Sequence, residues 1–425
     1  MTAHVAALLD LNDAALALWN GDSVLRSPGY ARWHDERYHF GLGAQAEARL
    51  HPRQLSTRYW SQLSLQPLVP ALGPARHSAD LVHTQLQDML AQQPASPLLL
   101  AVPGHFSRDQ LSLLLGILET LPTEVAGLVH RSAAIAAQTG IAEGSHVELQ
   151  LHQTVVTPLT KQDDRVLAGE AQTVPGFGWL WLLDRLADGV AAQFVEQTRF
   201  DPQRKASSEQ TLYDELPALL AALVQHSEYR LEIEGYTARL QRDPLSAVGR
   251  QWREELERVT DERHWLLRND LLTLPGLAGD GLTLRAECDD WQASTLAQAS
   301  ELRATADGLH LRREMVLNRS QPSGDFGVPG NKADDEVPTP AGDDDISALP
   351  THLLQDHHAT PLRDGLSLAG DARIRMDAGV PRLDGDIAPD LLVDDQQAKL
   401  GQALHLGATL SDSLGFAARL IRVEE

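Results

Sequence analysis

Short apolar stretches alternate with amphipathic ones along the first 318 residues of the chain. Stretches in which apolar residues run together or alternate with polar ones are predicted to be strands, at residues 5–9, 14–19, 98–102 and 125–129. Apolar residues at every third or fourth position predict helices over residues 78–92, 107–121 and 132–138. Ser107 and Gln110 form a capping-box pattern at the start of the second helix. Strands that alternate with helices in this way indicate an α/β sheet covered by helices.

Turn residues divide the chain further. The segment 30–40 predicts a hairpin that turns at Asp35 and Glu36, and a helix is predicted from Gly43 to Pro52. After Gly144 the alternation begins again. It predicts hairpin strands over 147–160 and 166–174, helices over 179–198 and 208–226, two strands over 229–242, a long charged helix or two over 244–269, and a buried strand with a tight turn over 271–279.

The composition changes after residue 318. Residues 319–350 are rich in proline, glycine and acidic side chains without periodicity, which predicts a flexible acidic linker. Residues 351–425 contain several short β-like runs separated by glycine, aspartate and proline, a spacing typical of a small β-sandwich or β-barrel. We therefore expect a larger α/β part at 1–318, a linker at 319–350 and a small all-β module at 351–425.

Charge and cysteine content exclude several classes of function. The chain has 36 Lys and Arg against 59 Asp and Glu, a formal charge of −23, which argues against binding to nucleic acid or to an anionic membrane. Cys288 is the one cysteine, so neither an intramolecular disulfide nor a cysteine zinc site can form. No basic leader pattern and no apolar run of about 20 residues occurs, so we expect a cytoplasmic protein without membrane insertion.

Four segments are similar to successive parts of one known domain. They read ALLDLNDAALALWNGD, YHFGLGAQAEARLHPRQLSTRYWSQL, LLLAVPGHFSRDQ with VAGLVHRSAAIAAQTG, and VELQLHQTVVTPLT with the helix that follows. Their order resembles the nucleotide-binding domain of the seventy-kilodalton heat-shock chaperone family, within the actin-like ATPase superfamily. The resemblance covers about three quarters of the chain. It implies a two-lobed actin-like fold, with lobes at about 1–145 and 146–318.

The same resemblance implies where a nucleotide cleft lies. In this family two glycine-rich hairpins hold the phosphates through backbone N–H groups, and a third loop faces the adenosine. The matching positions here are Asp10, Asn12 and Asp13 in the first loop, His152, Gln153 and Thr154 in the second, and Gly276 in the third, at Leu274–Leu277. The helix acid of the family falls near His130.

The residues at these positions argue against ATP hydrolysis. Glycine allows a backbone to approach a phosphate and to adopt positive φ, and the first two loops have lost their glycines. Asp13 adds a negative charge beside any phosphate, and Mg²⁺ is held in such sites by carboxylates of which only Asp10 is clearly retained. We therefore expect a pseudo-ATPase with no catalytic residues, no cofactor and a vestigial cleft.

The function predicted from these observations is that of a scaffold or adaptor that binds protein partners. The alternative is an active chaperone-like ATPase that binds ATP and Mg²⁺ through atypical loops. A further alternative treats the C-terminal module as a phosphopeptide-binding sandwich of forkhead-associated type. His34, His39, His357 and His358 lack neighbours at metal-ligand spacing, so no metal site is predicted.

Overall fold

The computed structural model describes residues 7–21, 23–223, 226–304 and 308–318, and short segments between 352 and 421. The chain divides into two units, Met1–Gly330 and Asn331–Glu425. The division falls inside the predicted linker 319–350, and that segment lies outside the described residues.

The first sheet combines an antiparallel meander with parallel strands. Its order is β19-β10-β9-β1-β2-β3, with β1–β2 and β2–β3 antiparallel and the β1–β9, β9–β10 and β10–β19 pairs parallel. The strands are β1 (Ala7–Asp10), β2 (Ala17–Trp19), β3 (Val24–Arg26), β9 (Leu98–Val102), β10 (Val125–His130) and β19 (Leu311–Arg312). β1 and β9 are buried along their whole length, which places the end of β1 deep in the molecule.

The second sheet repeats this plan. Its order is β18-β17-β11-β12-β13-β20, again with a three-stranded meander (β11, β12, β13) beside two parallel strands (β17, β18), and β14 pairs with β12. The strands are β11 (Gly144–Leu149), β12 (Gln153–Gln162), β13 (Arg165–Ala168), β14 (Gln172–Pro175), β17 (His264–Leu267), β18 (Thr283–Ala286) and β20 (Glu314–Val316). The observed fold of this unit is therefore α/β, as the sequence predicts.

A short helix joins the two sheets. The helix α4 (Arg131–Thr139) is rich in alanine and buried almost throughout, and it packs with apolar side chains of both sheets in one cluster. Small side chains let backbones approach closely, so α4 lies between the sheets as a thin layer. Gly140 follows the last helical residue in the left-handed conformation, close to the end of the predicted helix 132–138. The helices α8 (Trp291–Ala297) and α9 (Ala299–Leu302) pack on the same cluster.

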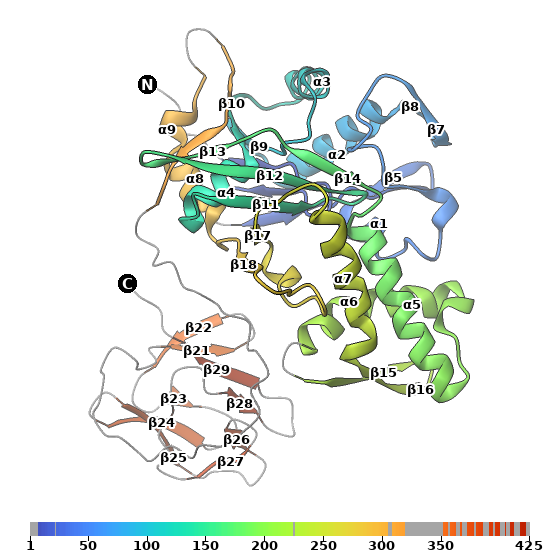
Figure 1. Ribbon diagram of the computed structural model, residues 1–425, viewed down its shortest axis with the longest axis vertical. Coiled ribbons are helices and arrows are strands. Elements are labelled where there is room, and N and C mark those ends of the chain that lie inside the picture. The colour runs from blue at the N-terminus through green and yellow to red at the C-terminus, as the bar shows by residue number, and fades with distance from the viewer. Residues whose placement is uncertain are drawn as a thin grey trace. The chain divides into compact units, whose positions relative to one another are not determined.

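The outer faces of the sheets are covered by separate groups of helices (Figure 1). On the first sheet these are α2 (Ser78–Gln92) and α3 (Arg108–Glu119), and Ser107 and Gln110 form both hydrogen bonds of the predicted capping box. On the second sheet they are α5 (Trp179–Thr198), α6 (Ala206–Ala222) and α7 (Arg242–Leu256), with the hairpin β15 (Glu228–Ile233) and β16 (Tyr236–Gln241) and the turn η2 (Pro202–Arg204).

Residues 31–77 form small elements between β3 and α2. Asp35 and Glu36 both have positive φ and join two antiparallel strands, which confirms the predicted hairpin. The elements are β4 (Ala31–His34), β5 (Arg37–Phe40), α1 (Gly41–Gln45), η1 (Pro52–Gln54), β6 (Leu55–Ser56), β7 (Pro67–Leu72) and β8 (Ala75–His77). The helix predicted from Gly43 to Pro52 is much shorter in the structure. Helix α1 ends at Gln45, and the chain then continues as separate turns.

Two sequence predictions near residue 270 are wrong. The charged helix ends at Leu256, and the apolar run His264–Leu267 is strand β17 because it fits between two strands of the buried sheet. The stretch predicted as a buried strand is instead the turn η3 (Asn269–Leu271) and a loop that turns at Gly276. A four-residue apolar run is too short for its periodicity to distinguish helix from strand.

The described residues of the second unit form two sheets, as the prediction of a β-rich module requires. The order of one is β22-β21-β29-β28-β26-β27 and that of the other is β23-β24-β25. The strands are β21 (His352–Gln355), β22 (His358–Pro361), β23 (Leu366–Ser367), β24 (Ala372–Asp377), β25 (Val380–Gly385), β26 (Leu392–Val393), β27 (Gln396–Gln397), β28 (Thr409–Ser411) and β29 (Ala417–Ile421). Ile374, Leu383, Leu410 and Leu420 belong to their shared core. In the parts of both units that the structure describes, no helix has the length and apolar character needed to cross a membrane.

A glycine sets the position of α5 against the second sheet. A Cβ on Gly178, which precedes this helix, would lie 2.4 Å from the backbone N of Gln153 and 2.5 Å from the carbonyl O of Leu151. We predict that Gly178→Ala destabilises the protein by roughly 2–3 kcal/mol, because backbone atoms must move to relieve this overlap. Gly43→Ala is the control, since a Cβ at that residue would meet no neighbouring atom within 4 Å. Urea unfolding measures both, and equal stabilities would contradict the prediction.

Candidate functional site

Two loops from different sheets meet at the centre of the first unit. The loop after β1 carries Asp13, whose backbone N–H donates to Gln150 Oε1 at 2.9 Å. In return the backbone N–H of Leu151, in the loop between β11 and β12, donates to Asp13 Oδ1 at 2.7 Å. Asn12 Nδ2 also donates to the carbonyl of Leu149, at 3.3 Å. The side chains of each loop therefore bind backbone groups of the other.

Asp13 is buried beneath this contact. Burial raises the pKa of its carboxyl group to about 7, and the nearby Glu148 adds to the rise. The hydrogen bonds from the backbone of Leu151 and Ala14 oppose the shift without cancelling it. Asp13 thus titrates near neutral pH, although it accepts a backbone hydrogen bond in a fixed geometry.

A buried guanidinium group lies beside the loops. Arg131 begins α4, and its Nε and Nη2 donate to the two carboxylate oxygens of Asp10 at 2.7 and 3.2 Å. Its Nη1 lies 3.3 Å from Glu148 Oε2, and its Nη2 lies 3.9 Å from Glu287 Oε2. One cation therefore faces three carboxylates, and all four groups are almost fully buried.

The three carboxylates experience this cation differently. Burial raises the pKa of Glu148, and the attraction of Arg131 offsets only part of that rise. For Glu287 burial is outweighed by Arg131 and by His146, whose Nε2 lies 3.0 Å from Glu287 Oε1, and the pKa falls to about 2. The other ring nitrogen of His146 lies 2.8 Å from Ser132 Oγ. Glu287 is therefore held ionised by two partners.

A cavity of about 480 Å³ opens on the outer side of this ionic cluster. Asp10, Arg131 and Glu287 form part of its wall. The side chains that complete it include Trp19, Arg26, Arg268, Asn269, Asp289, Asp290 and Trp291. Arg268 pairs with Asp270 through two hydrogen bonds of 2.6 and 2.7 Å.

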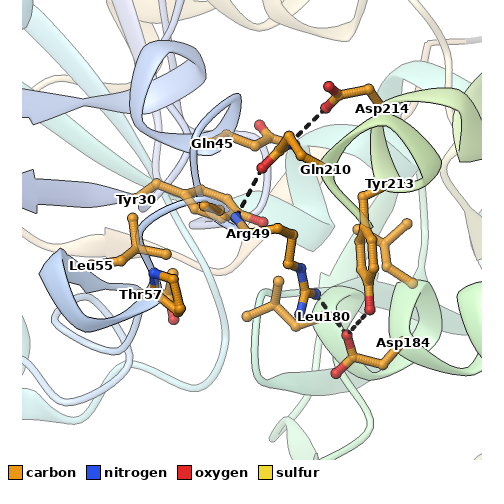
Figure 2. Close-up of a pocket in the computed structure, with 13 residues that line it drawn as sticks. Tyr30, Gln45, Arg49, Leu55, Thr57, Leu180, Asp184, Gln210, Tyr213 and Asp214 are labelled. Carbon is orange, nitrogen blue, oxygen red and sulfur yellow. Dashed lines mark hydrogen bonds and ion pairs between the residues drawn. The ribbon is translucent and has the colours of Figure 1, made fainter. Parts of the chain in front are cut away.

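A second, smaller cavity lies between the segment 30–57 and the helices α5 and α6 (Figure 2). Its volume is about 200 Å³. Thr57, which lines it, has its hydroxyl 2.9 Å from His152 Nε2. Burial lowers the pKa of His152 to about 4, so this imidazole is neutral near neutral pH.

The structure brings together some of the residues that the resemblance indicates and separates others. Asn12 and Asp13 lie against the second loop, and Asp10 pairs with Arg131 of α4, whereas His152 turns towards Thr57. Gln153 begins β12, and Thr154 Oγ1 donates to the carbonyl of Phe177 at 2.5 Å and accepts from Trp252 Nε1 at 3.0 Å. Gly276 lies against Ser246 of α7 and does not line the cavity beside Asp10. The residues after β17 that line this cavity are Arg268 and Asn269.

His130 occupies the position of the family's helix acid and is fully buried. Neither of its ring nitrogens has a hydrogen-bond partner among the residues that the structure describes. Burial lowers the pKa of His130 to about 3, with smaller contributions from Arg313 and His146. It is therefore a neutral imidazole and supplies no negative charge to the cleft.

Sequence reasoning missed Arg131, Glu148 and Glu287. Each of the three is a charged residue that lies inside a strand or directly after one. This position is a signal in the sequence, because a charge buried there needs a partner of opposite charge. Arg131 pairs with Asp10 over 121 positions and with Glu287 over 287 − 131 = 156, and periodicity carries no information about such pairs.

No family model matches this chain, and no curated protein matches it. Across the described parts of both units, no group of three or more His, Cys, Asp or Glu side chains is arranged to hold a metal ion. The site is therefore interpreted from its own geometry.

Removal of the central cation tests the ionic cluster. We predict that Arg131→Met lowers the free energy of unfolding by about 3–5 kcal/mol, because three buried carboxylates lose their shared counter-charge. Arg185→Met, which removes the half-exposed ion pair with Asp188, should change it little. Urea unfolding at neutral pH compares the two variants, and similar losses in both would contradict this account of Arg131.

The raised pKa of Asp13 predicts a pH-dependent stability. The ordinary pKa of an aspartate is 3.8, and that of Asp13 in the folded protein is about 7. At pH values between these two, the carboxyl group of Asp13 loses its proton in the unfolded chain and keeps it in the folded protein. This carboxyl group therefore lowers stability as pH rises across that window, and its effect is constant above it. We predict that Asp13→Asn, which retains an acceptor for Leu151, is more stable than the wild type at pH 8 by roughly 2–4 kcal/mol.

Thermal unfolding from pH 4 to 8 measures this difference, which should shrink towards pH 4. Asp88→Asn, at an exposed position of α2, is the control for the loss of one negative charge. A stability gain of Asp13→Asn that is the same at all pH values would contradict the assigned titration.

Proposed function

We propose that this protein is a non-catalytic member of the actin-like ATPase superfamily, of the heat-shock chaperone type, and that it acts as a scaffold or adaptor for protein partners. The proposal rests first on the repeated sheet plan. Both sheets place a three-stranded meander beside parallel strands, with α4 between them. This duplication supports the two-lobed fold that the resemblance implies.

The contact between the two loops carries the non-catalytic part of the proposal. In an actin-like ATPase the phosphates lie between these loops and accept hydrogen bonds from their backbone N–H groups. Here the N–H of Leu151 donates to Asp13, and the N–H of Asp13 donates to Gln150. A triphosphate would have to break both bonds and approach a buried carboxyl group.

The Arg131 cluster supports the same conclusion. In the family a carboxylate at the position of Asp10 acts with Mg²⁺ and its water ligands. In this chain that carboxylate accepts two hydrogen bonds from Arg131. The guanidinium supplies positive charge where a metal ion would otherwise bring it, so the protein itself provides part of the counter-charge of this acidic site.

Surface side chains support the scaffold role. Leu65 is 64% exposed, and Val69, on the adjoining strand β7, is 84% exposed. Large apolar side chains with such exposure are common at protein interfaces. The net charge of −23 favours partners with basic surfaces.

One observation favours the alternative of an active, ATP- and Mg²⁺-dependent enzyme. The cavity beside Asp10 holds about 480 Å³, which is within the range of small-molecule sites, and two tryptophans and three arginines contribute to its wall. A nucleotide bound there would need different phosphate contacts from those of the family, because the two loops are already joined.

Titration of the full-length protein with Mg-ATP separates the two functions. We predict no saturable binding by calorimetry and no rise in unfolding temperature at millimolar Mg-ATP, since the loop amides and the Asp10 carboxylate are already bound within the protein. Micromolar binding, with ATP turnover that disappears in Asp10→Ala, would establish the enzyme instead. Affinity capture with the full chain, compared with a Leu65→Ser, Val69→Ser variant, then tests the scaffold role.

A further inference from the structure

The smaller cavity has the features of a binding site. It is enclosed by the segment 30–57 on one side and by α5 and α6 on the other, and its volume is about 200 Å³ (Figure 2). Its lining includes Tyr30, Gln45, Arg49, Leu55, Thr57, Leu180, Asp184, Gln210, Tyr213 and Asp214. Drug-sized and cofactor ligands occupy about 300–1,000 Å³, so this cavity suits a smaller group.

Tyr30 contributes an unused polar group to the cavity. The residue is 3% exposed and lines the cavity wall. No hydrogen bond of its hydroxyl is found within the part of the chain that the structure describes, so this group is available to a molecule in the cavity. Burial raises the pKa of Tyr30, so the hydroxyl is protonated and able both to donate and to accept.

The charges around the cavity are unbalanced. Arg49 donates to Asp184 Oδ1 at 2.7 Å and lies 3.7 Å from Glu209 Oε1. Asp214 accepts a hydrogen bond of 2.9 Å from Gln210 Nε2. One arginine and three acidic side chains give these residues a formal charge of 1 − 3 = −2. Burial raises the pKa of Glu209, Arg49 opposes this rise, and Asp184 adds to it.

Acceptor atoms remain for a ligand. Asp184 Oδ1 already accepts from Arg49 and, at 2.6 Å, from the Tyr213 hydroxyl. Asp184 Oδ2 accepts no hydrogen bond within the described part of the first unit. Figure 2 shows Arg49 extending towards Asp184, with the ring of Tyr213 beside it. The guanidinium carbon of Arg49 lies 3.6 Å from the centre of that ring, so this wall already accommodates one organic cation.

We propose that this cavity binds a small organic cation, a primary ammonium or guanidinium group, through the free oxygen of Asp184 and the hydroxyl of Tyr30. The cation restores charge balance and supplies a donor to the unused acceptors. Two sources share this chemistry: a free alkylamine or alkylguanidine, and a lysine or arginine side chain of a partner protein. The inference does not depend on the state of the Asp10 site, because the two cavities share no lining residue.

Calorimetry on the full-length protein tests the proposal with n-butylammonium and ethylguanidinium as probes. We expect saturable binding with a Kd of roughly 0.1–10 mM, which is the range open to ligands of this size. The neutral isostere n-butanol and the anion butyrate should bind at least about tenfold more weakly. Absence of saturable binding by both cations, or equal binding of butanol, would overturn the proposal.

Two variants locate the binding. Tyr30→Phe removes only a hydroxyl that has no hydrogen-bond partner in the described structure, and should weaken cation binding about three- to tenfold with unchanged unfolding temperature. Asp214→Asn keeps an acceptor for Gln210 and should also weaken it. Cation binding unaffected by both changes would place it elsewhere and overturn the assignment.

Short peptides identify the source of the cation. If Gly-Lys-Gly or Gly-Arg-Gly binds more tightly than the free probes, the cavity takes a partner's side chain, and weaker binding assigns a free small molecule. Because this experiment contains no nucleotide, its failure leaves the Mg-ATP titration unaffected.

Discussion

The buried guanidinium of Arg131 is the interaction on which the centre of this fold depends. It binds Asp10 at the end of one sheet and lies within reach of Glu148 and Glu287 of the other, so it joins the two halves through charge as well as through packing. An unpaired charge at that depth would cost several kcal/mol, and the cluster exists because each acid shares the same cation. The loops around Asp13 close over the cluster and complete the connection with hydrogen bonds.

The acidic groups at this centre are stabilised by partners within the chain itself. In a site that binds Mg²⁺ and phosphates, carboxylates face one another across water before the ligands bind, and they repel one another. Here Arg131 provides a permanent counter-charge, and Gln150 reaches across to Asp13 and also donates to Glu148.

Local sequence signals predicted local structure well. The turn at Asp35 and Glu36, the capping box of Ser107 and the helix end at Gly140 all depend on neighbouring residues, and all are observed. The strand His264–Leu267 was missed because its identity comes from partners in the sheet. For the candidate site, the sequence indicated the two loops, but the bond between Asp13 and Leu151 spans 138 positions, and no local pattern encodes it.

The alanine-rich helix α4 has a mechanical consequence. Its residues Ala133 to Ala137 are fully buried, and side chains of both sheets pack on it in one continuous layer. Neither sheet can tilt against α4 without opening a void between them. A void in a close-packed interior costs free energy. The first unit should therefore respond to any bound molecule by small rotations of side chains, as a stiff body, and not by a swing of one half against the other.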